Sequence, residues 1–218
     1  MIIAIDGPAG AGKGTLARRL AEAMGYAYLD TGSIYRAVGA RLLDAGAAAN
    51  DRQAALNAAR NLDPADLERS DLRREAVSEA ASEVAVQPDV RQALLEFQRR
   101  FTASPPGGKT GAVLDGRDVG TVVCPHADAK LFLTATPEAR AERRHKELQE
   151  SGVESIYARV LEDIKARDER DSRRTAAPLR PAEDAVTLDT TALNADEVFA
   201  QALRIIAEKT GRTDIQQR

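Results

Sequence analysis

Nine residues near the N-terminus have the composition of a phosphate-binding loop. The stretch reads GPAGAGKGT, runs from Gly7 to Thr15, and nearly fits the pattern G-x-x-x-x-G-K-[S/T]. Glycines let the backbone wrap a polyphosphate with several N–H groups pointing inward, and Lys13 can then reach the β- and γ-phosphates. The departure is Gly14, where a hydroxyl usually binds magnesium. The stretch is therefore a damaged loop, a chance run of small residues, or a functional variant.

The residues on either side favour a working loop. An apolar run at 2–5 predicts a strand before it, and an apolar face over 15–24 predicts a helix after it. This order of strand, glycine loop and helix separates a phosphate loop from a chance run. We therefore expect the whole stretch to bind nucleotide: Gly7, Pro8, Ala9, Gly10, Ala11, Gly12, Lys13, Gly14 and Thr15.

A second motif, LDTGSIYR, follows the predicted strand at 26–29. Asp30 ends this strand at the carboxyl edge, where α/β proteins bind ligands. Arg36 lies near the start of the next predicted helix, 33–43, and can clamp a second phosphate group. Taken alone, the same residues fit an aspartate that caps a helix and an arginine on the surface.

A third motif, VLDGRDVG, follows the predicted buried strand at 112–114. An apolar strand that ends in a carboxylate can orient magnesium or its water, which makes Asp115 the candidate metal ligand. Arg117 and Asp118 then project into the same region. The alternative is a turn at the end of a strand with an internal ion pair.

A fourth motif, RDERDSRR, lies near the end of a charged helix predicted over 154–174. On a helix its charged residues share one face at i, i+3, i+4 and i+7, namely Arg167, Arg170, Asp171 and Arg174. Three arginines on one face repel each other unless anions are near, and phosphoryl transfer supplies such anions. The alternative is a solvated helix with i,i+4 pairs such as Asp163–Arg167.

The elements that must position these motifs alternate along the chain. Short apolar runs predict five strands, at 2–5, 26–29, 112–114, 130–133 and 185–188, with helices between them. This order predicts an α/β fold, a parallel sheet wrapped by helices on both faces. The gap of roughly 80 residues between the second and third strands is too long for a simple crossover, so a helical insertion is expected there.

The composition indicates which kinds of binding partner and which cellular compartment to expect. The 218 residues are 30% charged with a net charge of −3, so no basic excess indicates a nucleic-acid partner. Cys124 is the only cysteine, which fits a reducing compartment. The N-terminal MIIAID is too short for a signal peptide or a membrane span. We expect a cytoplasmic protein that binds neither membrane nor nucleic acid.

Together the motifs resemble those of the bacterial cytidylate (CMP/dCMP) kinases, over nearly the whole chain. The matching segments include IDGPAGAGKGTLA, LDTGSIYR, ASEVAVQPDVRQ, DGRDVGTVVCPHADAKLFL, RDERDSRRTAAPLRPAEDAV and LDTT. The resemblance implies a P-loop NTPase of the nucleoside monophosphate kinase type, whose GKGT loop holds magnesium largely through phosphates and water. It also implies a single kinase domain: a core of 1–35, 110–145 and 180–218, a monophosphate-binding insert at about 36–109, and a helical lid at about 146–176.

The resemblance further implies a role for each matching residue. Ser82, Arg91 and Asp118 would read the cytosine edge, while Arg36 and Arg117 would hold the CMP phosphate. Arg167 and Asp171 would meet the ribose side and Arg174 the phosphate, with Thr31 and Tyr35 lining the pocket. The catalytic residues would be Lys13, Arg117, Arg167, Arg170 and Arg174, with Asp115 binding magnesium directly or through water.

The implied reaction transfers a phosphoryl group from ATP to CMP or dCMP with Mg²⁺, in a monomeric enzyme. One departure from the family is visible between 62 and 82, where DPADLERSDLRRE is too short for the small extra sheet of many members. This puts the strength of monophosphate binding in question, not the chemistry. The open alternatives are another P-loop kinase, acting on UMP, AMP or a metabolite, and a nucleotide-binding regulator without catalysis.

Overall fold

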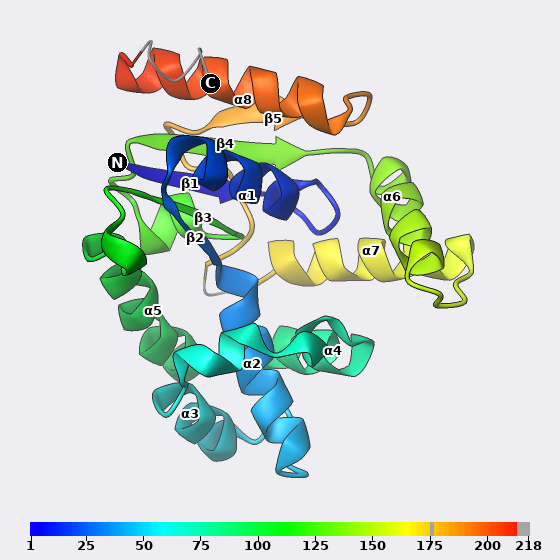
Figure 1. The fold of residues 1–218 in the computed structure, drawn as a ribbon. Coiled ribbons are helices and arrows are strands. Elements are labelled where there is room, and N and C mark those ends of the chain that lie inside the picture. The colour runs from blue at the N-terminus through cyan, green and yellow to red at the C-terminus, as the bar shows by residue number, and fades with distance from the viewer. Residues whose placement is uncertain (175–176, 213–218) are drawn as a thin grey trace. The chain divides into compact units, whose positions relative to one another are not determined.

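A five-stranded sheet forms the centre of the fold in the computed structural model, which describes residues 1–174 and 177–212. The strand order is β2-β3-β1-β4-β5, and β1 pairs in parallel with both β3 and β4 (Figure 1). The strands are β1 Ile2–Asp6, β2 Ala27–Asp30, β3 Ala112–Gly116, β4 Ala129–Thr134 and β5 Val186–Asp189. The predicted α/β class and the five strands are confirmed.

The register of the sheet places two of the candidate motifs at one edge. Ile5 pairs with Asp115 and Asp6 with Gly116, so β1 and β3 end side by side. The chain leaves β1 into the glycine loop and leaves β3 into the turn that carries Arg117. Parallel strands end at the same edge, so the loop and this turn are neighbours even though about 100 residues separate them in the sequence.

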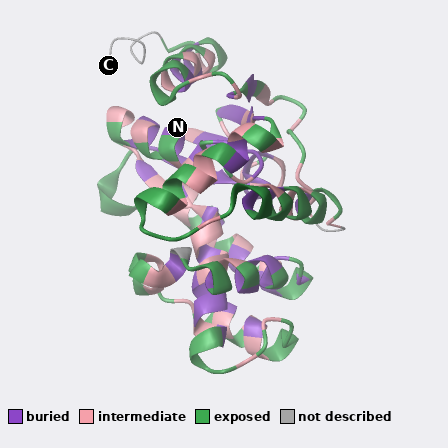
Figure 2. Cartoon of the chain, turned by 90° about the vertical axis from the view of Figure 1, so that its right-hand side faces the viewer, coloured by how far each residue is buried: buried purple, intermediate pink, exposed green. Residues whose placement is uncertain are grey.

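The chain forms two compact units, 1–29 with 105–218 and 30–104. The helices of the first are α1 Lys13–Met24, α6 Pro137–Glu150, α7 Tyr157–Ser172 and α8 Ala195–Thr210. Apolar faces of α1 and α8 pack with β1, β3 and β4 into one buried core that includes Leu20, Leu131 and Ile206. The inner strands β1, β3 and β4 are largely buried, while the outward faces of the helices are exposed (Figure 2). The phosphate loop therefore connects a buried strand to a helix that packs on the same core.

The second unit is helical, with α2 Thr31–Asp44, α3 Arg52–Arg60, α4 Glu75–Val84 and α5 Pro88–Ala103. Ala37 and Ala40 of α2 pack on Leu72 and Val77. Gly39 permits this packing, because a Cβ there would lie 3.0 Å from the backbone nitrogen of Ala81. As predicted, the short segment before α4 holds no strand; it forms two 3₁₀ turns, Pro64–Glu68 and Ser70–Arg73.

Most element boundaries differ from the prediction by one or two residues, and two differences bear on the site. The charged helix α7 begins at Tyr157 rather than 154 and ends at Ser172, so Arg174 lies beyond it. The turn after β3 is a single π-helical turn, Val119–Val123, which the sequence pattern did not indicate. Across the described residues, no helix is both long and apolar enough to cross a membrane.

Candidate active site

The phosphate loop depends on glycine at the points where the backbone is left-handed or crowded. Gly7 has φ +147°, and a Cβ there would lie 2.0 Å from the carbonyl oxygen of Leu133. Gly12 has φ +88° and caps the N-terminus of α1 without a side chain. L-residues rarely adopt these angles, so the loop keeps its shape only with glycine at these positions. The N-terminus of α1, with its free N–H groups, follows directly.

Lys13 is buried at the start of α1, and its ammonium group donates a hydrogen bond of 2.8 Å to the carbonyl oxygen of Pro8 within the loop. Burial lowers the pKa of Lys13, and the neighbouring Arg117 lowers it further, while Asp115 acts in the opposite direction. Burial and neighbouring cations both disfavour the charged form of a lysine, and a nearby anion favours it. A polyphosphate in the loop would be such an anion.

Asp115 lies beside the first turn of α1. Its Oδ1 accepts a hydrogen bond of 2.9 Å from the Tyr28 hydroxyl, and its Oδ2 lies 3.9 Å from where a Cβ on Gly14 would be. Within residues 1–174 and 177–212, no three His, Cys, Asp or Glu side chains gather into a metal-binding group. The donor set therefore fits a magnesium ion held by one carboxylate, with phosphate oxygens and water completing its coordination.

Asp6 is a site residue that the motif search missed. It is buried at the end of β1 and accepts hydrogen bonds from the backbone N–H groups of Val119 and Gly120, at 2.8 and 2.7 Å. Burial raises the pKa of Asp6 to about 6, although the two N–H groups favour its charged form. Asp6 thus fixes the turn that carries Arg117 and Asp118. Its only sequence signal was a carboxylate at the end of a buried strand.

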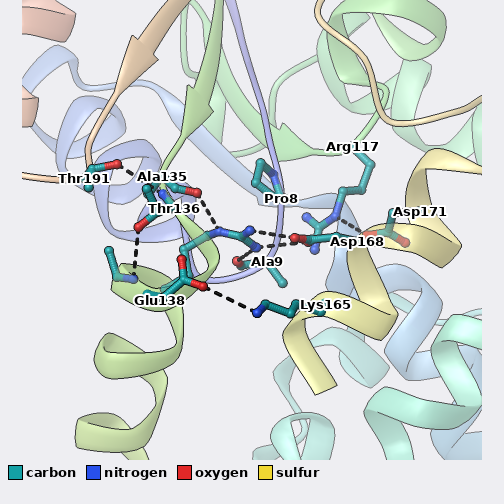
Figure 3. Close-up of polar contacts among 12 residues, drawn as sticks. Pro8, Ala9, Arg117, Ala135, Thr136, Glu138, Lys165, Asp168, Asp171 and Thr191 are labelled. Carbon is teal, nitrogen blue, oxygen red and sulfur yellow. Dashed lines mark hydrogen bonds and ion pairs between the residues drawn. The ribbon is translucent and has the colours of Figure 1, made fainter. Parts of the chain in front are cut away.

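A buried carboxylate gathers two of the predicted arginines. Asp171 accepts a hydrogen bond of 2.8 Å from Arg117 Nε and pairs at 2.5 Å with Arg174, and its own side chain is 1% exposed. Burial alone would raise the pKa of Asp171, but Arg117 and Arg174 hold it below its usual value. Arg167 is also close enough to affect the pKa values of Asp171 and Lys13. Figure 3 shows Arg117 and Asp171 facing each other.

The predicted arginine face of α7 needs correction at its C-terminal end. Because the helix ends at Ser172, Arg174 reaches Asp171 from beyond the helix rather than along a shared face. Arg170 is exposed, in contrast to the buried Asp171 next to it. Lys13 is thus close enough to Arg117, Arg167 and Asp115 for their charges to shift its pKa. Asp171 is influenced in the same way by Arg117, Arg167 and Arg174.

The remaining predicted residues belong to the second unit. Asp30 caps α2 by accepting the N–H of Ser33, and it also pairs with Arg36 at 2.5 Å. The Arg91 guanidinium lies 5.7 Å from the centre of the Tyr35 ring and donates to the carbonyl oxygen of Ala85. Thr31 on α2 and Ser82 on α4 are buried. This unit therefore presents two arginines, each already oriented by a partner.

Comparison with known proteins gives the family of the sequence. The family model described as cytidylate kinase matches residues 3–208. A cytidylate kinase of Paramagnetospirillum magneticum is 63% identical over 208 residues, which cover 95% of this chain and 98% of that protein. A cytidylate kinase of Methylocella silvestris is 57% identical and covers 94% of each chain.

Solved structures agree with this fold at low sequence identity. An uncharacterised protein from Eubacterium ventriosum aligns with a TM-score of 0.54 at 13% identity, over 95% of this chain and 98% of its own. A gluconokinase from Sinorhizobium meliloti aligns with a TM-score of 0.51 at 17% identity, over 99% and 97%. At such identities the likeness concerns the fold alone.

Proposed function

The chain belongs to the cytidylate kinase family, and we propose that it transfers the γ-phosphoryl group of ATP to CMP or dCMP, giving ADP and CDP or dCDP. The observation that carries the proposal is the family match over residues 3–208, in a chain that keeps a phosphate loop with a buried lysine. The other P-loop kinases considered from the sequence would need a different acceptor, and the family match disfavours them.

The proposed chemistry is in-line phosphoryl transfer. A phosphate oxygen of CMP attacks the γ-phosphorus of ATP, and the bond to the β,γ-bridging oxygen breaks as ADP leaves. The attacking oxygen is already anionic, so no general base is needed. Catalysis then rests on position and charge, for which we assign Lys13, Arg117, Arg167, Arg170 and Arg174. For Lys13, Arg117 and Arg167 the support is their mutual electrostatic influence, and for Arg174 it is the pair with Asp171.

We assign the acceptor site to the residues that the family resemblance matched, some in each unit. Ser82, Arg91 and Asp118 would read the cytosine edge, which offers an exocyclic amine as donor and a ring carbonyl and nitrogen as acceptors. Arg36, Arg117 and Arg174 would bind the phosphate, and Arg167 and Asp171 the ribose side. Thr31 and Tyr35 would line the pocket. The support is that Arg36 and Arg91 are already held in place within the second unit.

Magnesium and ATP complete the proposed active site. Asp115 would hold the ion, directly or through water, and the loop residues 7–15 would hold the ATP phosphates. When bound, the ion would neutralise charge on the phosphates during transfer. The division into a core (1–35, 110–145, 180–218), an insert (36–109) and a lid (146–176) is part of this proposal, as are a monomeric state and a cytoplasmic location.

The deciding experiment is a coupled assay that measures ADP release with ATP and each of CMP, dCMP, UMP and AMP. We expect turnover with the cytidine nucleotides, at least tenfold above the others in kcat/KM. Arg91→Ala and Asp118→Asn should each raise the KM for CMP while leaving the KM for ATP within about twofold. Turnover with AMP or UMP alone would indicate a different kinase, and ATP binding without any turnover would indicate a regulator.

A further inference from the structure

One buried guanidinium outside the proposed active-site residues connects three parts of the first unit. Arg140, in the first turn of α6, is 3% exposed. Its Nε donates to the carbonyl oxygen of Ala135 at 2.9 Å, and one terminal nitrogen donates to that of Ala9 at 3.1 Å. Both terminal nitrogens also bond the carboxylate of Asp168 on α7, at 2.9 and 2.6 Å.

The contact with the phosphate loop is steric as well as polar. Gly10 has φ +75°, and a Cβ there would lie 3.1 Å from the Cβ of Arg140 and 3.3 Å from its carbonyl oxygen. The outer turn of the loop therefore lies directly against the start of α6. Any movement of Arg140 would change the support of the backbone at Ala9 and Gly10.

The contact with α7 lies beside the proposed catalytic residues. Asp168 follows Arg167 and lies one helical turn before Asp171, which pairs with Arg117. The forked Arg140–Asp168 pair thus fixes the rotation of the helix that carries these side chains. Four of the five N–H donors of Arg140 are used by three partners, an arrangement that a lysine cannot reproduce.

We propose that Arg140 is a positioning residue that holds the phosphate loop and the arginine-bearing helix α7 in register, with Asp168 as its partner. The effect on catalysis rests on the proposed function. Arg140 need not touch a nucleotide for this role; it sets the distance between the loop around Lys13 and the side chains of α7. A displacement of about 1 Å between reacting groups can cost on the order of 100-fold in rate.

The chain offers two matched controls on the same pair of helices. Lys165 and Glu138 also join α7 to α6, at 3.4 Å, but their side chains are 55% and 57% exposed and their ion pair does not involve the loop. Ile164 is buried against Ala141 in the apolar contact between the two helices. Lys165→Gln removes a connection of the same two helices, and Ile164→Val weakens their packing.

The experiment compares Asp168→Asn and Arg140→Lys with these controls. We expect kcat to fall about 10- to 100-fold in both test variants, and to stay within about twofold of the unchanged protein in Lys165→Gln and Ile164→Val. Hydrogen exchange without nucleotide should become faster at the amides of residues 7–12 and in α7 only in the test variants. Thermal unfolding of all four variants shows how far each is destabilised.

Two results would overturn the inference. One is a kcat for Asp168→Asn within about twofold of the unchanged protein, with normal exchange in the loop. The other is an equal loss of kcat in Ile164→Val at an equal loss of thermal stability, since helix packing would then explain the effect. If the unchanged protein does not phosphorylate CMP, the proposed function fails, and the exchange measurement still tests the positioning role.

Discussion

Gly14 is the one loop glycine whose presence the backbone does not require. A Cβ at this position would meet only ordinary contacts, 3.7 Å from the Arg18 guanidinium and the Tyr28 hydroxyl and 3.9 Å from Asp115 Oδ2. Gly7 and Gly10, in contrast, have positive φ and crowded surroundings. The missing hydroxyl is thus a matter of chemistry rather than space, and the carboxylate nearest to this position is that of Asp115.

Replacing Gly14 by serine tests this interpretation. The hydroxyl of Gly14→Ser would lie near Asp115, so we expect the variant to fold and to need less Mg²⁺ for half-maximal activity. Gly14→Ala adds the same Cβ without the hydroxyl and is the matched control. The measurement is initial rate against free Mg²⁺ at saturating ATP and CMP. Identical Mg²⁺ curves for the serine and alanine variants would contradict the proposed role of this position.

Asp6 predicts a specific dependence of stability on pH. In the folded protein the pKa of the Asp6 carboxyl is about 6, so the group stays protonated up to about that pH. In the unfolded chain the carboxyl has its ordinary pKa of 3.8 and loses its proton at lower pH. Asp6 therefore contributes stability below about pH 4 that is lost as the pH rises through 6, at up to about 1.4 kcal/mol per pH unit.

The non-titrating variant Asp6→Asn isolates this contribution. We expect the free energy of unfolding of the unchanged protein to fall relative to that of Asp6→Asn between pH 4.5 and 7. Denaturant unfolding of both proteins across this range measures the difference. A difference that is the same at every pH would show that Asp6 titrates as it does in the unfolded chain.

At the scale of elements, ion pairs hold the short segment before α4. Arg69 donates from Nε and one terminal nitrogen to both oxygens of Asp71, at 2.9 and 2.8 Å, and from its other terminal nitrogen to Asp44 at 2.6 Å. Arg41 of α2 pairs with Asp66 at 2.8 Å. These pairs attach the two 3₁₀ turns to α2, because the segment contributes few apolar side chains of its own.

Removal of the Arg69 cluster should therefore give a salt-dependent effect. These side chains are partly exposed, so we expect Arg69→Gln to lower the melting temperature by only about 2–4 °C in low salt. The loss should shrink in about 1 M salt, where the pairs of the unchanged protein are screened. Arg60→Gln, at an exposed arginine of α3, is the control. A loss of equal size at both salt concentrations would mean that Arg69 acts through packing instead.

For the whole molecule, the residues assigned to ATP lie in the first compact unit, whereas those assigned to CMP come from both. The loop and Lys13 belong to the first unit, while Arg36, Arg91 and Ser82 belong to the second. If these assignments hold, ATP should stabilise the loop of the first unit, whereas CMP should also stabilise the second unit, because a ligand stabilises the state that binds it.

Hydrogen exchange with each nucleotide alone can test this division. A non-hydrolysable ATP analogue should slow exchange chiefly at residues 7–15, and CMP should slow it at the start of α2 and in α5. AMP at the same concentration is the control for non-specific anion binding. Protection by CMP that is confined to the first unit would contradict the assignment of Arg36 and Arg91 to the acceptor site.

The sequence alone determined the local features of this protein. The order of strand, glycine loop and helix, the helix that starts after Asp30 and the absence of strands at 62–82 all follow from residues near each other in the chain. The family resemblance also came from the sequence, because it rests on contiguous motifs, and the comparisons confirm it. Periodicity and turn residues record such local choices directly.

Only the tertiary structure decided which side chains meet. Asp6 binds the turn 113 residues further on, Arg117 binds Asp171 across 54 residues, and Arg140 supports a loop residue 131 positions earlier. Arg174 belongs with Asp171 even though the helix has ended before it. Such contacts depend on strand register and helix packing, which bring distant residues together without any periodic pattern in the chain. For that reason GPAGAGKGT identified the loop from sequence, while the residues that support it became visible only in the fold.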